Sequence, residues 1–409
     1  MMRSKKAAAL LLAALMGISL LGGCKSKESG AGTSGGGAPA QETQKTEAVR
    51  ETDAAAAKET DAKAAGKETE SASPEAGATR TITDVFGREV EIPAEVTKAA
   101  ALGSSARLAV YAGGVDKIVG VTEMELRGDP GMPYAYANRE HFANCQALAS
   151  GGSGNADYAE AIVELDPDVI FYNDSDTVAM EDLARKTGLP VIGVYGDAFN
   201  SDVFLDSVTL IGEVLGTEEH AGQVVESVRG WIKDLDDRTK DIPEEDKPKV
   251  YTGAVSWSGG HGFTGTYVDY APLTAIHALN LADELNATDG VEVSMEQILE
   301  WDPDIIFLNP GNMGLVNEEY KADPAAIDSL KAVQAGDIYA QVNFNYYWCN
   351  MELAIVDAYY AGTVVYPEAF SDVDFEEKAE EIFNVMLGMD YLDVLKDNGT
   401  PFDKITIGA

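Results

Sequence analysis

The sequence predicts an α/β protein made of two lobes, and three observations lead to this fold class. A stretch of fifteen residues occurs twice, at 159–173 and 295–309, with identical residues at nine aligned positions. Each copy has the pattern of a helix, an Asp-Pro-Asp turn and a short apolar strand. A helical pattern over 217–239 is long enough to connect two lobes. We therefore interpret the two copies as a duplicated unit, one in each lobe.

Proline sets the end of the helix in each copy. Pro167 and Pro303 disfavour α geometry at the aspartate before them. The residues that follow, 169–171 and 305–307, form short apolar runs, which are typical of buried parallel strands.

The other elements are predicted from the same periodicities. Alternation around Gly87 indicates a hairpin over 80–93. Further strands are expected at 98–102, 191–195, 249–255 and 337–342, and helices at 108–112, 201–242 with a break near Gly216, from about 271, and at 376–387.

The chain begins with the pattern of an export signal. Basic Arg3, Lys5 and Lys6 precede an apolar core over 7–21, which is too short for an ordinary spanning helix. Residues 21–24 resemble the lipobox of bacterial lipoproteins, which implies a diacylated Cys24; cleavage elsewhere is the alternative. Such a lipid would tether the protein to the extracytoplasmic face of the cell membrane.

Residues 25–79 contain hardly any aliphatic side chain larger than alanine, so we expect a disordered tether. The formal charge of −39 argues against nucleic acid and anionic lipid as partners. Cys145 and Cys349 could pair or stay reduced, and the sequence does not decide. We expect a monomer with no second membrane segment.

The folded part resembles the substrate-binding proteins of ABC importers for ferric siderophores, haem and cobalamin. The motifs that carry the resemblance are residues 83–88 with Ile92-Pro93, the two Asp-Pro-Asp repeats, and residues 366–370. The resemblance implies two Rossmann-like lobes, 80–216 and 243–409, joined by a single helix over 217–242. It also implies capture of a small ligand between the lobes, little hinge motion, and delivery to a permease with its ATPase.

The resemblance places ligand contacts in the loops that follow the strands. By position these are Ser104, Ser105, Arg107, Tyr134, Tyr136, Gly152, Ser153, Asn173, Trp257, His261, Asn309, Asn345, Tyr346 and Trp348. It also implies that Glu160 and Glu296 pair with permease arginines. Acidic residues in a first helical turn are common for stability alone, which is the plainer explanation of both.

The ligand class follows from the cations that are available. The chain has no arginine after Arg238, so only Arg107, Arg127 and Arg139 could meet an anionic chelate. We expect a lightly charged iron chelate or cobalamin, and no cofactor apart from iron or cobalt inside the ligand. An oxyanion such as molybdate or tungstate, bound at Ser104 and Ser153, is the alternative.

Two other function classes are disfavoured. Residues 260–265 match the dinucleotide fingerprint, which would suggest a secreted oxidoreductase, but no helix is expected directly after them. A bare-metal receptor needs several converging histidines, and only His261 of the four histidines lies in a predicted ligand loop. The sequence therefore predicts a binding protein and no enzyme.

Overall fold

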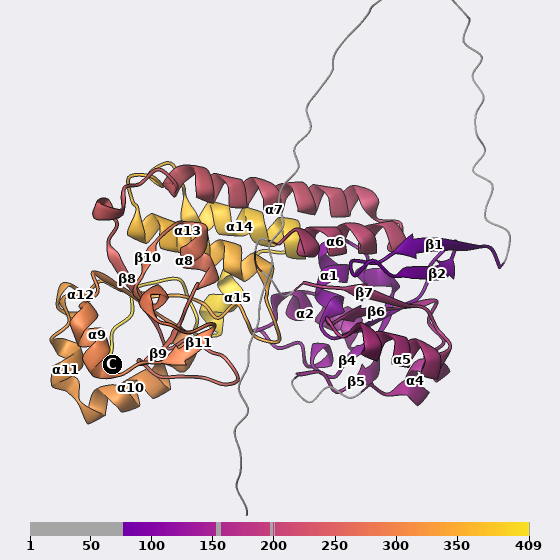
Figure 1. The fold of residues 1–409 in the computed structure, drawn as a ribbon, viewed down its shortest axis with the longest axis horizontal. Helices are drawn as coiled ribbons and strands as arrows, with labels where there is room; N and C mark the ends of the chain where they lie inside the picture. Colours follow the sequence, from indigo (N-terminus) through magenta and orange to yellow (C-terminus); the bar gives the residue numbers. More distant parts are fainter. Residues whose placement is uncertain (1–76, 153–156, 197–198, 200, 409) are drawn as a thin grey trace, which may run out of the picture. The chain divides into compact units, whose positions relative to one another are not determined.

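Two parallel sheets, each containing one copy of the repeat, form the framework of the protein (Figure 1). The structure is a computed structural model, which describes residues 77–152, 157–196, 199 and 201–408. Three predictions lie outside the described residues: the signal with Cys24, the tether up to residue 76, and Ser153. The fold is α/β, as predicted.

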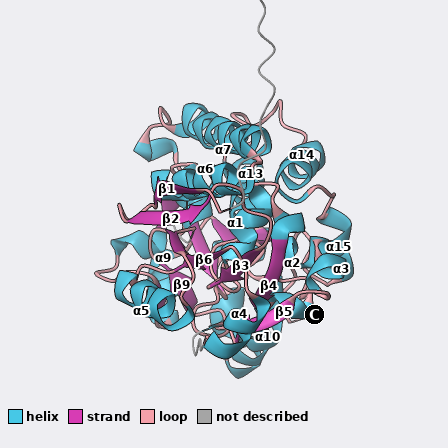
Figure 2. Cartoon of the chain, turned by 90° about the vertical axis from the view of Figure 1, so that its right-hand side faces the viewer, coloured by secondary structure: helices cyan, strands magenta, loops and turns pink. Residues whose placement is uncertain are grey.

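The N-terminal sheet has five parallel strands in the order β5-β4-β3-β6-β7. The strands are β3 (Ala99–Leu102), β4 (Ile118–Thr122), β5 (Gln146–Ala149), β6 (Val169–Asn173) and β7 (Val191–Val194). Helices surround them (Figure 2): α1 (Ser105–Tyr111), α2 (Pro133–Ala137), α3 (Arg139–Phe142), α4 (Ala159–Leu165), α5 (Thr177–Thr187) and α6 (Asp202–Leu215).

The C-terminal sheet has four parallel strands in the order β10-β8-β12-β13. They are β8 (Lys249–Gly253), β10 (Leu279–Asn280), β12 (Ile305–Leu308) and β13 (Ile338–Ala340). A separate antiparallel pair is formed by β9 (Gly265–Tyr267) and β11 (Gly290–Glu292). The helices are α8 (Ala271–Ala275), α9 (Met295–Trp301), α10 (Met313–Ala322), α11 (Pro324–Asp328) and α12 (Lys331–Ala335).

The predicted hairpin is β1 (Thr79–Thr83) paired with β2 (Glu89–Pro93), with Gly87 at φ 78°. Asp84 connects it to the N-terminal sheet. The buried carboxylate accepts hydrogen bonds from Arg88 Nη2 at 2.6 Å and from the backbone N–H of Gly193 at 3.0 Å. The motif at residues 83–88 is thus explained by the attachment of the hairpin to the N-terminal sheet.

The duplicated Asp-Pro-Asp turns have the same structure in both sheets. Asp166 and Asp302 end α4 and α9 in the left-handed region, at φ 49° and 43°, which aspartate tolerates. Asp168 accepts hydrogen bonds from the backbone N–H groups of Thr97 (2.7 Å) and Lys98 (2.9 Å). Asp304 accepts one from Lys249 N at 2.8 Å. Each turn therefore fixes the start of the neighbouring strand.

Long helices connect the two sheets. The helix α7 (Glu218–Thr239) leads from α6 to the C-terminal sheet, and Gly216 separates it from α6 as predicted. The chain ends with α13 (Met351–Val365), α14 (Phe375–Leu387) and α15 (Leu392–Asp397). The helix α13 packs against α7, α8 and α14, and α14 also contacts α1 and α2.

The largest cluster of buried apolar side chains includes residues of both sheets. Phe171 of β6, Phe307 of β12 and Ile355 of α13 belong to the same cluster. The two lobes thus share a core along their helical side, in addition to the single helix expected between them. Their strand ends remain open to the cavities described below.

Candidate functional site

Two adjoining cavities lie beyond the carboxyl ends of the strands. Their volumes are about 580 and 400 Å³, and both are lined by Trp257, Ser258, Asn345 and Trp348. The larger cavity also contacts Met124 and Gly152, which follow strands of the N-terminal sheet. Open α/β sheets bind ligands at this end of their strands, because the loops there carry variable side chains above a fixed sheet.

The segment after β8 forms one wall. Trp257 stacks on His261 with ring centroids 3.4 Å apart and planes 5° from parallel. His261 in turn contacts Glu292 Oε1 through Nδ1 at 2.6 Å. A side chain at Gly290 would place its Cβ 2.1 Å from the indole, so glycine is required there. The imidazole therefore supports Trp257 from behind and does not line either cavity.

The segment between β13 and α13 forms the facing wall. Asn345 donates from Nδ2 to Ser256 O at 2.8 Å, which joins the two walls. Tyr347 and Trp348 are both in the left-handed region, at φ 52° and 71°. The Trp348 side chain is nevertheless 53% exposed and lines both cavities. Strained residues of this kind are typical of functional sites.

The cavity walls carry almost no charge. Among the described lining residues there is no lysine or arginine, and Asp269 in the smaller cavity is the one carboxylate. The remaining polar groups are hydroxyls, amides and backbone. Such walls offer stacking and neutral hydrogen bonds to a ligand and no partner for a strong negative charge.

Five of the predicted ligand residues line these cavities: Gly152, Trp257, Asn345, Tyr346 and Trp348. Several others are buried below them with protein partners. Asn173 Nδ2 donates to Ser104 Oγ at 2.8 Å, Ser105 Oγ donates to Phe171 O at 3.0 Å, and Asn309 Nδ2 donates to Ser256 Oγ at 3.3 Å. Tyr136 packs edge-on against Tyr391. The burial of Ser104, Ser105, Asn173 and Asn309 argues against direct contact with a ligand, whereas Tyr136 is half-buried.

Arg107, which was predicted to meet an anionic ligand, is buried in the structure. Its side chain is fully buried, and Nη1 donates to Cys349 O at 2.6 Å while Nη2 donates to Tyr347 O. The guanidinium lies 5.1 Å from the ring of Tyr134, whose hydroxyl donates to Glu125. Arg107 and Tyr134 thus belong to an internal polar network.

That network contains two buried carboxyl groups, Glu125 and Glu352. Burial raises the pKa of both, and hydrogen bonds from Thr122 and Tyr111 respectively oppose this effect, as does the charge of Arg107. One guanidinium therefore faces two carboxyl groups inside the protein.

Some lining residues were not predicted. They are Met124, Tyr195, Phe199, Ser256, Ser258, Gly259, Gly260, Tyr267, Asp269, Tyr270, Ala271, Asn343, Phe344, Tyr347 and Cys349. Six of them are aromatic and lie at or beyond the end of a strand, so the rule that located Trp257 and Trp348 would have included these six if it had been applied to every aromatic residue.

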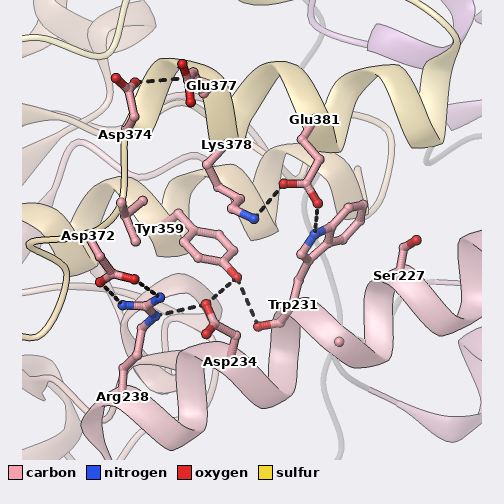
Figure 3. Close-up of a pocket in the computed structure, with 12 residues that line it drawn as sticks. Ser227, Trp231, Asp234, Arg238, Tyr359, Asp372, Asp374, Glu377, Lys378 and Glu381 are labelled. Atoms are coloured by element: carbon pink, nitrogen blue, oxygen red, sulfur yellow. Dashed lines mark hydrogen bonds and ion pairs between the residues drawn. The ribbon is translucent and has the colours of Figure 1, made fainter.

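A third cavity of about 660 Å³ lies between α7 and α14, where it is lined by side chains of the helices (Figure 3). Both of its cations pair with carboxylates of the lining. Arg238 contacts Asp372 at 2.7 Å and Asp234 at 2.9 Å, and Lys378 contacts Glu381 at 2.6 Å. Since both cations are already paired and the lining also carries the carboxylates of Asp374 and Glu377, the strand-end cavities are the better candidate site.

Cys145 and Cys349 are not bridged to each other. Burial raises the pKa of the Cys145 thiol to about 11. Within the described ranges, no three metal-binding side chains converge. Over the same residues, no helix has the length and apolarity needed to span a membrane.

Comparison with known proteins agrees with this geometry. Residues 99–341 match the profile of a family described as periplasmic binding protein. The chain is 28% identical over 237 residues to the uncharacterized ABC transporter substrate-binding lipoprotein YvrC of Bacillus subtilis. This alignment covers 56% of this chain and 69% of YvrC. It is 22% identical over 337 residues to the molybdate-binding protein MolA of Haemophilus influenzae, covering 76% of this chain and 92% of MolA.

Among solved structures, a periplasmic solute binding protein from Veillonella parvula has the same fold. The TM-score is 0.64 at 19% identity, over 81% of this chain and 98% of that one. The profile match spans both sheets and α7. The chain therefore belongs to the periplasmic binding protein family.

Proposed function

We propose that this solute-binding protein captures an iron chelate or a corrinoid outside the cell and delivers it to the permease of an ABC importer. The observation that carries the proposal is the pair of strand-end cavities with Trp257 and Trp348 on facing walls. Aromatic faces and neutral amides suit a large, flat ligand with little net charge.

The lining residues favour a corrinoid or a lightly charged chelate over ferric citrate-like anions. An anionic chelate would need cations, and no lysine or arginine is found on the described walls. Molybdate is a second candidate, because the relative MolA, matched over 92% of its length, is named for it. In this chain Ser104, which was expected to bind an oxyanion, is buried and bonded to Asn173.

A binding panel tests the proposal. Purified protein is titrated calorimetrically with cyanocobalamin, haem, a ferric hydroxamate, ferric citrate and sodium molybdate. We expect micromolar or tighter binding of one of the first three, and at least a tenfold loss in each of W257F and W348F. W231F, with its indole between α7 and α14, is the matched control and should bind normally. Binding of molybdate alone would establish the second candidate instead.

Docking to the permease is proposed for α4 and α9. Glu160 and Glu296 are exposed in the first turns of these helices, at equivalent positions of the repeat. One turn further on, Val163 and Leu299 are also exposed, by 50% and 37%. Each lobe thus presents a carboxylate beside an apolar side chain, which suits a partner with two copies of a cationic, partly apolar surface.

Membrane attachment through a diacylated Cys24 completes the proposal. Replacement of Cys24 by alanine should release the protein from the membrane fraction into the medium, whereas C145A should leave it attached. Membrane retention of a C24A protein that has lost residues 1–23 would rule out this anchor.

We also propose that the protein has no enzymatic activity. The glycine-rich residues 260–265 lead into the strand β9, whereas a dinucleotide site requires a helix at that point. Incubation with NAD and a search for absorbance that remains with the protein would test this.

A further inference from the structure

The backbone carbonyls of residues 344–349 are held from two sides in an alternating pattern. Asn350 Nδ2 donates to Phe344 O (3.1 Å), Tyr346 O (3.0 Å) and Trp348 O (3.5 Å). Arg107 donates to the carbonyls on either side of Trp348, Tyr347 O and Cys349 O. One amide and one guanidinium therefore fix most of the carbonyl groups of this loop.

The loop needs this support because of its conformation. Tyr347 and Trp348 are consecutive residues with positive φ, which side chains other than glycine rarely adopt. Such a conformation persists only when surrounding contacts determine it. Tyr347 is also held at its other end, because its hydroxyl lies 3.3 Å from Thr122 Oγ1.

An arginine suits this position for geometric reasons. The planar guanidinium donates two parallel N–H bonds, which match two carbonyls on the same side of the loop. A lysine would keep the charge but has no rigid fork. Because Arg107 lies on α1 and the loop follows β13, the interaction also joins the two lobes.

We propose that Arg107, together with Asn350, is a positioning residue that fixes Trp348 at the junction of the two cavities before any ligand arrives. The statement that Trp348 then meets the ligand rests on the function proposed above. Arg107 acts through the loop and does not touch the ligand itself.

The first test needs no ligand. Trp348 emission is isolated by subtracting the spectrum of W348F from that of the full chain, and its anisotropy decay and acrylamide quenching are measured. In the wild type we expect slow decay only. In R107K we expect an additional fast component and at least a twofold larger quenching constant. R238K is the matched control, because Arg238 also donates to a backbone carbonyl, that of Ala369, away from the loop. It should leave Trp348 unchanged.

A fast component in the wild type would overturn the proposal, as would unchanged Trp348 dynamics in R107K. The wild-type measurement decides even if R107K does not fold, and N350A provides a second variant with the same expected increase in mobility.

The second test uses cyanocobalamin as the probe in a double-mutant cycle. If Arg107 acts through Trp348, R107K and W348F should each weaken binding about tenfold, and the double variant should be no weaker than W348F alone. Additive losses would mean that Arg107 contributes independently and would overturn the proposal. If cyanocobalamin does not bind the wild type, that result counts against a corrinoid ligand, while the fluorescence test still decides the role of Arg107.

Discussion

Trp348 combines a half-exposed indole with a backbone at φ 71°. The backbone conformation and the stacking surface therefore favour different residue types at this position. Glycine would suit the backbone, but only an aromatic residue provides the stacking surface. The hydrogen bonds from Arg107 and Asn350 offset the strain. Trp257 reaches the same cavities with an unstrained backbone, because stacking on His261 is enough to orient it.

This difference predicts opposite effects of glycine at the two tryptophans. A left-handed conformation costs alanine about 1 kcal/mol, so W348G should be more stable than W348A by about that amount. Trp257 is not among the residues with positive φ, and there W257G should be less stable than W257A by about 0.5–1 kcal/mol. Urea denaturation of the four variants measures both differences. Equal stability of W348G and W348A would contradict the assigned backbone conformation.

Among the elements, α13 is one of the helices that join the lobes, through its contacts with α7, α8 and α14. Its side chains are buried on nearly every side, and it includes the buried carboxyl groups of Glu352 and Asp357. Burial raises the pKa of Asp357 well above its usual range, and the one opposing effect is a hydrogen bond from Val342 N at 3.0 Å. The folded protein therefore holds a proton on Asp357 more tightly than the unfolded chain does.

The free energy of unfolding should therefore fall as pH rises. A carboxyl group with a raised folded pKa favours folding at low pH, and this contribution is lost as pH rises from the unfolded pKa, about 3.9, towards the folded pKa. Relative to D357N, the wild type should lose up to about 1.4 kcal/mol of unfolding free energy per pH unit in this window. Urea denaturation at pH 4.5, 6 and 7.5 measures it. A constant difference between the two proteins would contradict a raised pKa for Asp357 in the folded protein.

On the scale of the whole molecule, the strand and the helix of each duplicated unit contribute to two different surfaces. Its strands, β6 and β12, lead to the strand-end cavities, while its helices, α4 and α9, present Glu160 and Glu296 to solvent. The surfaces proposed for ligand capture and for docking are thereby separated within one repeat. Because α7, the shared core and Arg107 all join the lobes, we expect little hinge motion on binding.

The separation predicts that docking can be removed without loss of binding. The double variant E160K/E296K should abolish uptake of labelled ligand by cells that carry the permease, since the charges would then repel a cationic surface. Its ligand affinity should stay within about twofold, because the altered residues are exposed on α4 and α9. The control E181K/E318K makes the same change of charge at exposed positions on α5 and α10 and should transport normally. Normal uptake by E160K/E296K would exclude the docking role.

Much of the fold could be predicted because its signals are local. The Asp-Pro-Asp repeat, the hairpin at Gly87 and the break at Gly216 each depend on a few neighbouring residues. The helix α13 was missed for a related reason. It is apolar on all sides, so it lacks the one-sided periodicity that identifies surface helices.

The sequence by itself determined the duplicated α/β architecture, the strand-end location of the candidate site and the aromatic character of its loops, because periodicity and turn residues are properties of adjacent positions. Only the tertiary structure decided which loop residues reach the cavities. Arg107 is the clearest example: its partner carbonyls lie 240 and 242 positions further along the chain, and such a pairing depends on how the lobes pack and leaves no local pattern.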